Sequence, residues 1–487
     1  MGKKISIDPI TRLEGHGKIE IFLDDDGNVK NAYLQVPELK GFEQFCIGRP
    51  VEELPRIVPR ICGVCPTTHH LAATKAVDAV YKTQPTETAI KIRRLINNAF
   101  MMEDHLLHFF FLGGPDFVVG PDAPPGERNI LGVIGKVGVE IGKKVIEARK
   151  RLRYIITTLG GRVIHPVFGL PGGVSKGITQ ELLEEFIPIA EEAIEFAQFT
   201  LKVFEDIVLK NKAYVDLIVG DIYKHQTYYM GMVDENNKVD LYDGKIRVVD
   251  PNGKEYVKFE GKDYLDHISE HVEPWSYIKF PFLKNIGWKG FEDGVESGIY
   301  RVAPLARLNA SDGMKTPLAQ IEYERLFDTL GGKPVHNTLA FHWARLVEVL
   351  YAAEEMRDLL ADGSIVNPDI RNIPTATPKE GVGVVEAPRG TLIHHYKTDD
   401  NGIVTGVNLI VASIGNSAAM SMSIGKAAKG LIKDGKAPES ILNMVEMAFR
   451  PYDPCLACAT HSLPGQMPLI VNLYDPEMNK VQTIKRD

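Results

Sequence analysis

Two C-x-x-C pairs stand near opposite ends of this chain and constrain its fold more than any other feature. The pairs are Cys62/Cys65 and Cys455/Cys458, and 390 positions separate Cys65 from Cys455. Each pair can grip one ion, and four thiolates together suit zinc, an iron-sulfur cluster or a late transition metal such as nickel. A zinc knuckle usually takes its ligands from neighbouring sequence. The separation therefore predicts a core site at which the two ends of the chain meet.

The composition excludes several other classes of protein. The 487 residues are 44% hydrophobic and 25% charged, which is typical of a globular chain with a large core. A net charge of −8 without a basic run argues against nucleic-acid binding, and no apolar window is long enough for a membrane span. Five cysteines are too few for a disulfide scaffold and indicate a reducing compartment. The fifth, Cys46, is predicted to be a packed, inert thiol.

The hydrophobic pattern of the first half predicts a β-hairpin followed by long helices. Residues 4–36 alternate like two strands around the turn at residues 24–28. Helical spacing begins at Thr86, and a second long helix fits residues 130–159. A third begins after Thr179, which can cap it, and Pro188 is expected to kink it.

The second half returns to strands before further helices. Residues 214–300 read as a β-rich insertion, helices are expected at 317–330 and 337–360, and residues 409–412 look like a strand before a last helical stretch. Residues 467–474 read as an apolar strand. We therefore predict a mainly α fold with small β parts (α+β), a core of long helices, and a single unit over residues 1–487.

A histidine accompanies each cysteine pair. The two stretches are CGVCPTTH, ending at His69, and CLACATH, ending at His461. Four thiolates can close a tetrahedral zinc site completely, so structural zinc and a redox or catalytic metal both remain open on chemistry alone.

The residues around both pairs resemble the two signature motifs of nickel-iron hydrogenase large subunits. The matching stretches are RICGVCPTTHH at residues 60–70 and DPCLACATH at residues 453–461. The resemblance covers essentially the whole chain and includes RLEGH at residues 12–16, GFE at residues 41–43, and His165-Pro166 followed by PGGVS. It implies a catalytic subunit that splits or makes molecular hydrogen.

The resemblance assigns a role to each cysteine. Cys62 and Cys455 are implied to be terminal ligands of nickel, whereas Cys65 and Cys458 are implied to bridge to an iron that carries carbon monoxide and cyanide. Thiolates supply electron density to a soft redox metal, which agrees with this assignment.

Further roles are implied for residues around the metals. Glu14 matches the glutamate that relays a proton from a terminal thiolate such as that of Cys455. Arg389, after Pro388, and Ser413 match the partners of the iron-bound cyanides, although Ala412 stands where many family members have proline. Asp116 matches the aspartate that pairs with the active-site arginine.

A histidine and a second metal site complete the implied set. His69 is expected to form a hydrogen bond near the open coordination position. Glu43, His461 and the Leu409 carbonyl resemble the ligands of a second, harder metal, magnesium or iron.

The resemblance also implies processing and partners. A maturation endopeptidase of the family cuts after the last histidine, so residues 462–487 are expected to be a C-terminal extension. No cysteine remains for an iron-sulfur cluster, so electrons need an iron-sulfur small subunit, followed by a heterodisulfide reductase, deazaflavin or NAD(P) module. The chain looks most like cytoplasmic viologen-reducing, heterodisulfide-linked or other bidirectional members.

Two alternatives compete with this interpretation. One is a complex I-like electron-transfer subunit that derives from a hydrogenase but has lost its cysteines, and the presence of all four cysteines argues against it. The other is a structural zinc scaffold.

Overall fold

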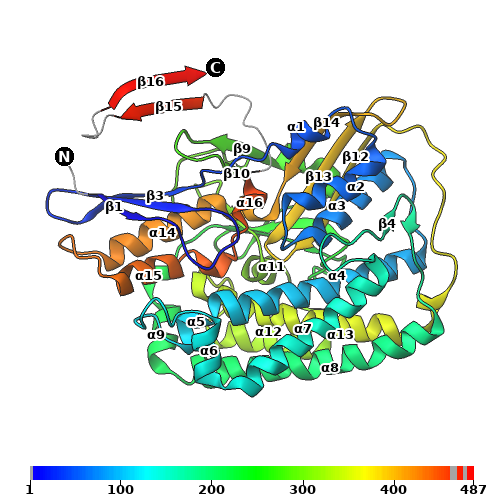
Figure 1. Cartoon of the computed structure of the whole chain (residues 1–487), viewed down its shortest axis with the longest axis horizontal. Coiled ribbons are helices and arrows are strands. Elements are labelled where there is room, and N and C mark those ends of the chain that lie inside the picture. The colour runs from blue at the N-terminus through cyan, green and yellow to red at the C-terminus, as the bar shows by residue number, and fades with distance from the viewer. Residues whose placement is uncertain (1–3, 461–468, 475–479, 487) are drawn as a thin grey trace.

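A bundle of long helices forms the base of the molecule in the computed structural model, which describes residues 4–460, 469–474 and 480–486 (Figure 1). Helix α13 packs against three of its neighbours, and α7 joins α4 to α8. The bundle helices are α4 (Glu87–Leu107), α7 (Val139–Gly160), α8 (Gln180–Phe204), α12 (Pro317–Thr329) and α13 (Phe341–Ala361). The architecture is α+β, as predicted.

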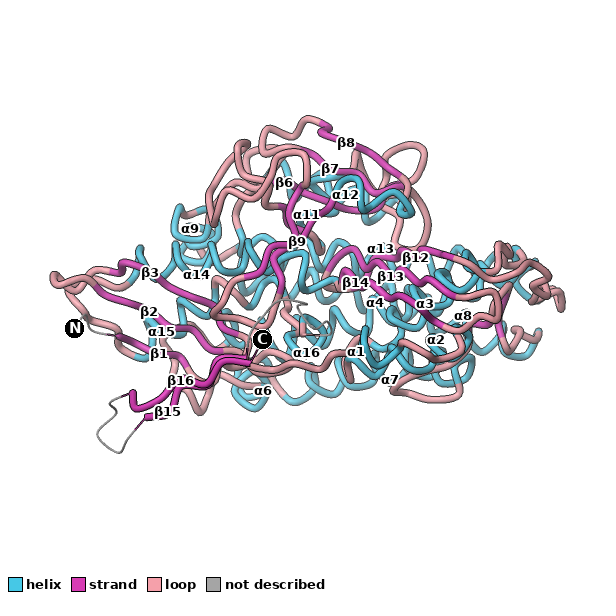
Figure 2. The backbone as a smooth tube through the Cα atoms, turned by 90° about the horizontal axis from the view of Figure 1, so that it is seen from above, coloured by secondary structure: helices cyan, strands magenta, loops and turns pink. Residues whose placement is uncertain are grey.

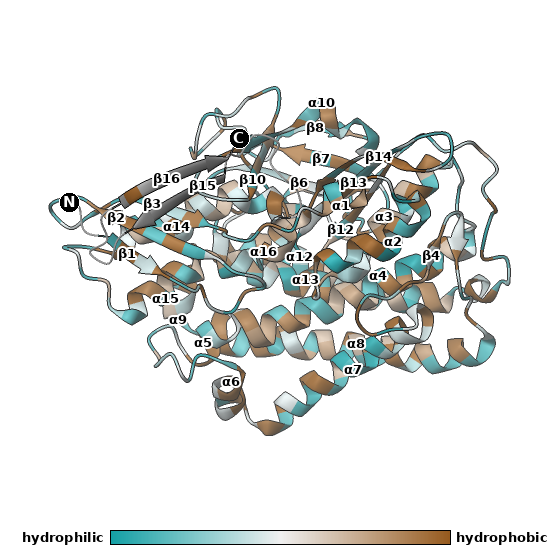
Figure 3. Cartoon of the chain, turned by 45° about the horizontal axis from the view of Figure 1, so that its top comes forward, coloured by the Kyte–Doolittle hydropathy of each residue, from teal (hydrophilic) through white to brown (hydrophobic). Residues whose placement is uncertain are grey.

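The predicted long helices form with one difference. The Thr179 side chain accepts a hydrogen bond from the first turn of α8, as expected, and Thr86 caps α4 in the same way. Helix α8 continues through Pro188. The helix expected over residues 130–159 is instead two helices, α6 (Ile130–Val137) and α7. They separate at Gly138, whose φ of 94° is outside the helical region and suits only glycine. Polar and apolar residues alternate around the bundle helices (Figure 3).

The N-terminal segment forms a three-stranded antiparallel sheet rather than only a hairpin. Strands β2 (Lys18–Leu23) and β3 (Val29–Gln35) make the predicted hairpin, and β1 (Lys4–Ile7) adds to the free edge of β2. The sheet lies beside α14 (Ser417–Leu431) and α15 (Glu439–Met447) (Figure 1). This places the first residues of the chain next to its last helices.

The expected β-rich insertion contains two small sheets. One has the order β11-β6-β7-β8, and the other pairs β9 with β10. Their strands are β6 (Tyr228–Val233), β7 (Lys245–Val249), β8 (Glu255–Phe259), β9 (Ile268–Val272), β10 (Lys279–Leu283) and β11 (Tyr300–Arg301). The first residues of the predicted range belong to a helix, α9 (Lys212–Val219). Seen from above, β6 to β8 lie on one side of the molecule together with α12 (Figure 2).

A further sheet, which the hydrophobic pattern mostly did not predict, carries part of the site. Strands β12 (Glu380–Ala387), β13 (Gly390–Thr398) and β14 (Val404–Ile410) pair in that order, and helix α3 (Pro66–Val80) packs on β12 and β13. Two glycines permit this close packing: a Cβ on Gly381 or Gly383 would lie 2.4 Å or less from the α3 backbone. The strand expected at residues 409–412 is the end of β14, which stops at Ile410.

Segments close to the two ends of the chain meet at the centre of the fold, where Glu14 pairs with Cys455. The short helix α16 (Leu456–Ala459) lies between the N-terminal sheet and the β12–β14 sheet, above the bundle (Figure 1). One cluster of buried side chains includes residues from β1, α3, α13 and α16. The strand expected near residue 470 is β15 (Leu469–Tyr474), which pairs with β16 (Lys480–Arg486).

Candidate metal centre

The first cysteine pair lies in a stiff, proline-rich stretch. A 3-10 turn, Val58–Ile61, ends at Cys62, and α3 begins at Pro66 immediately after Cys65. Proline suits the first position of a helix because no hydrogen bond is lost there. The backbone N–H groups of Val64 and Cys65 donate to the Cys62 sulfur at 3.2 and 3.3 Å. Local sequence therefore sets the direction of both sulfurs.

The second pair depends on distant contacts. Cys455 precedes α16, which contains Cys458 and has only four residues. Cys455 pairs with Glu14 as an isolated parallel bridge, and the N–H of Leu456 donates to the Glu14 carbonyl at 2.9 Å. The Ser413 hydroxyl accepts the N–H of Cys455 at 3.0 Å. Segments from both halves of the chain thus hold this pair.

All four predicted sulfurs come together. They lie within 4.8 Å of one another and are buried. The Sγ atoms of Cys62 and Cys455 are 3.1 Å apart, those of Cys65 and Cys458 are 3.3 Å apart, and those of Cys455 and Cys458 are 2.8 Å apart. These separations exceed the bond of a disulfide, about 2.05 Å, and all four cysteines are free. The predicted meeting of the two chain ends is confirmed.

The electrostatics of the four sulfurs fit a bound cation. Hydrogen bonds from the other three cysteines hold the pKa of Cys62 well below its usual range. Burial raises the pKa values of Cys455 and Cys458 well above theirs. Several thiolates would repel one another in this dry pocket, and a metal ion supplies the compensating charge. The donor set therefore fits a soft metal such as the nickel of a nickel-iron group.

Glu14 lies directly against this cluster. Its Oε2 atom is 2.9 Å from the Cys455 sulfur and accepts the N–H of Ala457 at 3.1 Å. Burial, followed by the charge of Cys62, raises the pKa of Glu14. A raised pKa brings a carboxylate nearer to the range in which it exchanges protons at neutral pH.

Arg389 lies in the turn between β12 and β13, after the buried Pro388, and its side chain is 2% exposed. It forms two hydrogen bonds with the Asp104 carboxylate, at 2.8 and 3.1 Å, and an ion pair with Asp453 at 3.0 Å. Burial opposes its charge, but these carboxylates and the thiols of Cys455 and Cys65 raise its pKa. Burial raises the pKa of Asp104 to about 7.

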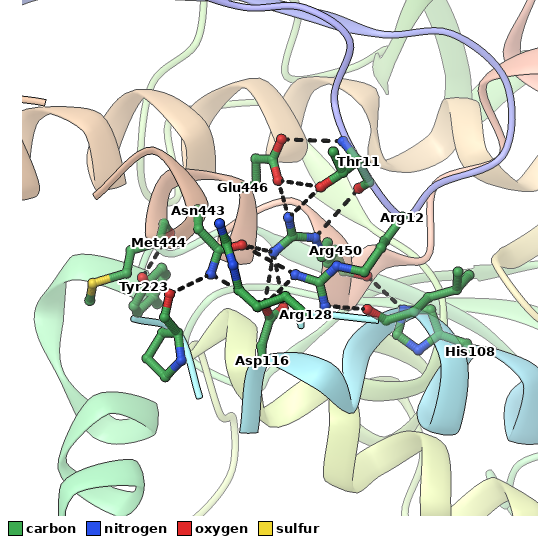
Figure 4. Close-up of polar contacts among 12 residues, drawn as sticks. Thr11, Arg12, His108, Asp116, Arg128, Tyr223, Asn443, Met444, Glu446 and Arg450 are labelled. Atoms are coloured by element: carbon green, nitrogen blue, oxygen red, sulfur yellow. Dashed lines mark hydrogen bonds and ion pairs between the residues drawn. The ribbon is translucent and has the colours of Figure 1, made fainter. Parts of the chain in front are cut away.

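The prediction that Asp116 pairs with this arginine is wrong. Asp116 is the second residue of α5 (Pro115–Val118) and instead binds Arg12 and Arg450 (Figure 4). Asp104 and Asp116 lie only twelve positions apart in the chain, so the sequence does not tell which of the two aspartates meets Arg389. A π-helical turn, His108–Gly113, separates them and sends them to different arginines.

His69 lies on the first turn of α3 and belongs to a buried hydrogen-bonded chain. Its Nδ1 is 3.1 Å from Nε2 of His394, and Nδ1 of His394 is 2.6 Å from the hydroxyl of Tyr396. His394 and Tyr396 are both on β13. These hydrogen bonds orient the ring of His69, which is four positions after Cys65.

Two members of the expected second metal site lie together. Glu43, on α1 (Phe42–Cys46), accepts the backbone N–H of Leu409 at 2.8 Å. The third member, His461, lies outside the described residues. Cys46 is buried as predicted, and burial raises its pKa to about 12.

Sequence reasoning missed several residues of this region. Asp453 stands within the DPC motif, and Arg12 within the RLEGH motif, so their positions were visible although their contacts were not. Asp104 had one signal, a charged residue on the apolar face of a helix. His394 and Tyr396 had none, because their β13 strand was not predicted.

Comparison with known families identifies the chain. The nickel-dependent hydrogenase family matches residues 40–123 and 279–461, and a HoxL-like family matches residues 4–39. The chain belongs to the family of nickel-dependent hydrogenase large subunits.

Individual relatives agree over almost the full length. The chain is 52% identical to an iron-sulfur subunit of the F420-non-reducing hydrogenase of Archaeoglobus profundus, over 99% of each chain. It is 39% identical to NAD-reducing hydrogenase HoxS subunit beta of Cupriavidus necator, over 98% of each chain. A crystal structure of an NAD+-reducing NiFe hydrogenase in the H2-reduced state superposes with a TM-score of 0.88 and 38% identity, covering 94% of this chain and 99% of that one.

The chain is therefore the catalytic subunit of a nickel-iron hydrogenase, an oxidoreductase that cleaves hydrogen. Its four grouped cysteines are a metal site consistent with a nickel-iron centre. The relatives are named as subunits, which implies that this chain too works with other subunits. In the described part of the chain, no helix is both long enough and apolar enough to cross a membrane.

Proposed function

We propose that the four cysteines hold nickel and iron in two kinds of position. Cys62 and Cys455 would hold nickel alone, and Cys65 and Cys458 would hold both nickel and an iron that carries carbon monoxide and cyanide. When bound, this group supplies the redox-active, Lewis-acidic site at which hydrogen is cleaved heterolytically. The burial of all four sulfurs within 4.8 Å supports this proposal.

Glu14 accepts the proton that cleavage delivers to the Cys455 sulfur. The single observation that carries this role is the 2.9 Å contact between that sulfur and Oε2 of Glu14. This distance is within the reach of direct proton transfer, and the raised pKa suits the task.

Two further side chains keep the anionic ligands of iron in place. Arg389 provides a fixed positive charge, and the Ser413 hydroxyl, which accepts the N–H of Cys455, can still donate its own proton. Pro388 stiffens the turn that carries Arg389. His69, oriented by His394, would offer a hydrogen bond near the bound metals.

A second metal, magnesium or iron, is proposed near the C-terminal pair. Glu43, the Leu409 carbonyl and His461 would supply oxygen and imidazole ligands, which suit a hard ion. The contact between Glu43 and the Leu409 N–H supports a shared location for the first two.

The tail and the partners complete the proposal. Residues 462–487 are a maturation extension that an endopeptidase removes, which agrees with a family match that ends at residue 461. Electrons leave through an iron-sulfur small subunit to a heterodisulfide reductase, deazaflavin or NAD(P) module in the cytoplasm. Names of relatives such as "F420-non-reducing" favour an acceptor other than the deazaflavin F420.

Neither alternative is favoured. A complex I-like electron-transfer subunit would lack the cysteines, and the relatives of this chain are hydrogenases rather than zinc scaffolds.

Metal analysis and one substitution test the proposal. Complex purified without oxygen should contain nickel and iron, with infrared bands of metal-bound carbon monoxide and cyanide; zinc alone would overturn it. Glu14→Gln should keep these bands but slow the exchange of H2 with D2O by about a hundredfold. Glu20→Gln is the matched control, since Glu20 pairs with Lys4 and Lys18 in the N-terminal sheet. Normal exchange in Glu14→Gln would exclude Glu14 as the proton acceptor.

A further inference from the structure

Three charged residues, of which Asp116 and Arg450 are buried, form a cluster of ion pairs (Figure 4). The Asp116 carboxylate accepts Nη2 of Arg12 at 2.5 Å, and Nη1 of Arg450 lies 3.0 Å from each of its oxygens. The side chains of Arg12, Asp116 and Arg450 are 11%, 1% and 0% exposed. We call these three residues the clamp.

Three further side chains complete the hydrogen bonds of the clamp. The Asn443 side-chain oxygen accepts from Arg12 at 3.2 Å and from Arg450 at 3.0 Å. Arg450 also binds Glu446 and the Thr11 hydroxyl, and Thr11 donates to Glu446. Two guanidinium groups thus meet two carboxylates, so the network is neutral. A buried charge cluster is tolerated only when its members are paired in this way.

The clamp holds the backbone of Arg12 in an unusual conformation. Arg12 has a φ of 57°, in the left-handed region that non-glycine residues seldom adopt. Its Nη1 donates to the Leu112 carbonyl at 2.9 Å, in addition to its bonds with Asp116 and Asn443. Backbone strain of this kind persists only where the surroundings fix it, and it often marks a functional site.

The two arginines lead directly to the reacting atoms. Arg12 is two residues before Glu14, and Arg450 is five residues before Cys455. Between clamp and site, the two segments pair through the bridge of Glu14 with Cys455. Gly15, with a φ of 87°, permits this approach, because a Cβ there would lie 2.7 Å from the Ala457 nitrogen. No clamp residue contacts a cysteine by a hydrogen bond or ion pair in the described chain.

We propose that Asp116 is a positioning residue for proton transfer: by binding Arg12 and Arg450 together it sets the distance between the Glu14 carboxylate and the Cys455 sulfur. This inference rests on the proposed role of Glu14. The clamp fixes both segments at points only two and five residues away, so its loss lets the carboxylate and the sulfur shift relative to each other. Proton transfer requires hydrogen-bond contact and falls steeply with small displacements.

A double-mutant cycle on the assembled, metal-loaded enzyme tests the inference. Asp116→Asn keeps the shape of the side chain but removes its charge, and should slow H2/D2O exchange about tenfold at unchanged nickel content and infrared bands. If Asp116 acts through Glu14, the double variant Asp116→Asn/Glu14→Gln exchanges at the rate of Glu14→Gln alone. If instead the rate losses of the two single variants multiply in the double variant, Asp116 acts independently of Glu14 and the proposal is overturned.

A second ion pair separates positioning from general loss of stability. Asp78 binds the buried Arg93 from α3, away from Glu14. Asp78→Asn should lower stability while H2/D2O exchange per nickel stays at the wild-type rate. Normal exchange in Asp116→Asn with slow exchange in Glu14→Gln refutes the positioning role alone. Normal exchange in Glu14→Gln refutes the proposed function itself. Arg12→Lys, which keeps a charge at this position, should restore part of the rate that Arg12→Ala loses.

Discussion

Two buried arginine-aspartate clusters lie near the C-terminal cysteine pair, and they differ in what they touch. Arg389 with Asp104 and Asp453 lies close enough to the thiols for Cys455 and Cys65 to raise the pKa of its guanidinium. The clamp reaches the cysteines only through the backbone.

The carboxylates of the two clusters also differ in their electrostatics. Burial raises the pKa of Asp104 to about 7, whereas Arg450 and Arg12 overcome burial and lower the pKa of Asp116. Asp104 shares the single guanidinium of Arg389 with Asp453, whereas Asp116 binds two arginines, of which Arg450 also binds Glu446. The same residue types can therefore tune a reactive site or lock a backbone, depending on the ratio of charges.

Substitution of the arginines should produce the largest difference in activity between the two clusters. Arg389→Ala and Arg450→Ala each leave buried carboxylates unpaired and should each cost about 3–5 kcal/mol of stability. Only Arg389→Ala also removes a charge beside the thiols, so its hydrogen-dependent dye reduction per nickel should fall at least about a hundredfold. The dye reduction of Arg450→Ala should fall less, because Arg450 forms no hydrogen bond or ion pair with a cysteine in the described chain and affects the site only by positioning the backbone. Equal losses of activity would break the distinction.

Neutralising the aspartates should separate the clusters by stability. Asp116→Asn should lower the free energy of unfolding by about 3 kcal/mol, because two buried guanidinium groups lose their shared partner. Asp104→Asn should cost about 1 kcal/mol, because the fold already favours its neutral form and Asp453 still pairs with Arg389. Urea unfolding followed by tryptophan fluorescence measures both. A larger cost for Asp104→Asn would contradict the charge-ratio argument.

The pH dependence of stability should have opposite signs for the two aspartates. The folded pKa of Asp116 is lowered from 3.8, so its contribution is complete above about pH 4 and is lost as the pH falls through the lower, folded value. The folded pKa of Asp104 is raised to about 7, so its ionisation destabilises the fold above that pH, and this cost disappears as the pH falls from 7 towards 3.8.

Unfolding midpoints of wild type and the two asparagine variants check these signs between pH 4.5 and 8. The difference between wild type and Asp104→Asn should change with pH over this range. The difference between wild type and Asp116→Asn should stay constant. A constant difference for Asp104→Asn would show that Arg389 keeps this aspartate ionised throughout.

The smallest effect is expected outside both clusters. Cys46→Ala removes a buried thiol that is not one of the four grouped cysteines, and should cost about 1 kcal/mol of stability with unchanged hydrogen turnover. Loss of nickel from this variant would show that the metal site extends further than the four sulfurs.

The sequence alone located most of the chemistry. The two C-x-x-C pairs and Glu14 stand in motifs whose residue types suit a soft metal and a proposed proton acceptor, whereas Arg389 was indicated only through the family resemblance. Helical periodicity likewise located α4 and α8, and the residue type of Thr179 indicated the cap of α8. These features were readable because each depends on residues close together in the chain.

Tertiary structure alone decided which charges meet. Asp104 lies on α4 and Asp116 on α5, twelve positions later, and nothing in their spacing tells which of them faces Arg389. The break at Gly138 and the β12–β13 turn that carries Arg389 were equally hidden. Short-range patterns fix local conformation and donor chemistry, but ion-pair partners depend on the directions in which distant segments present their side chains, and only the packed fold sets those directions.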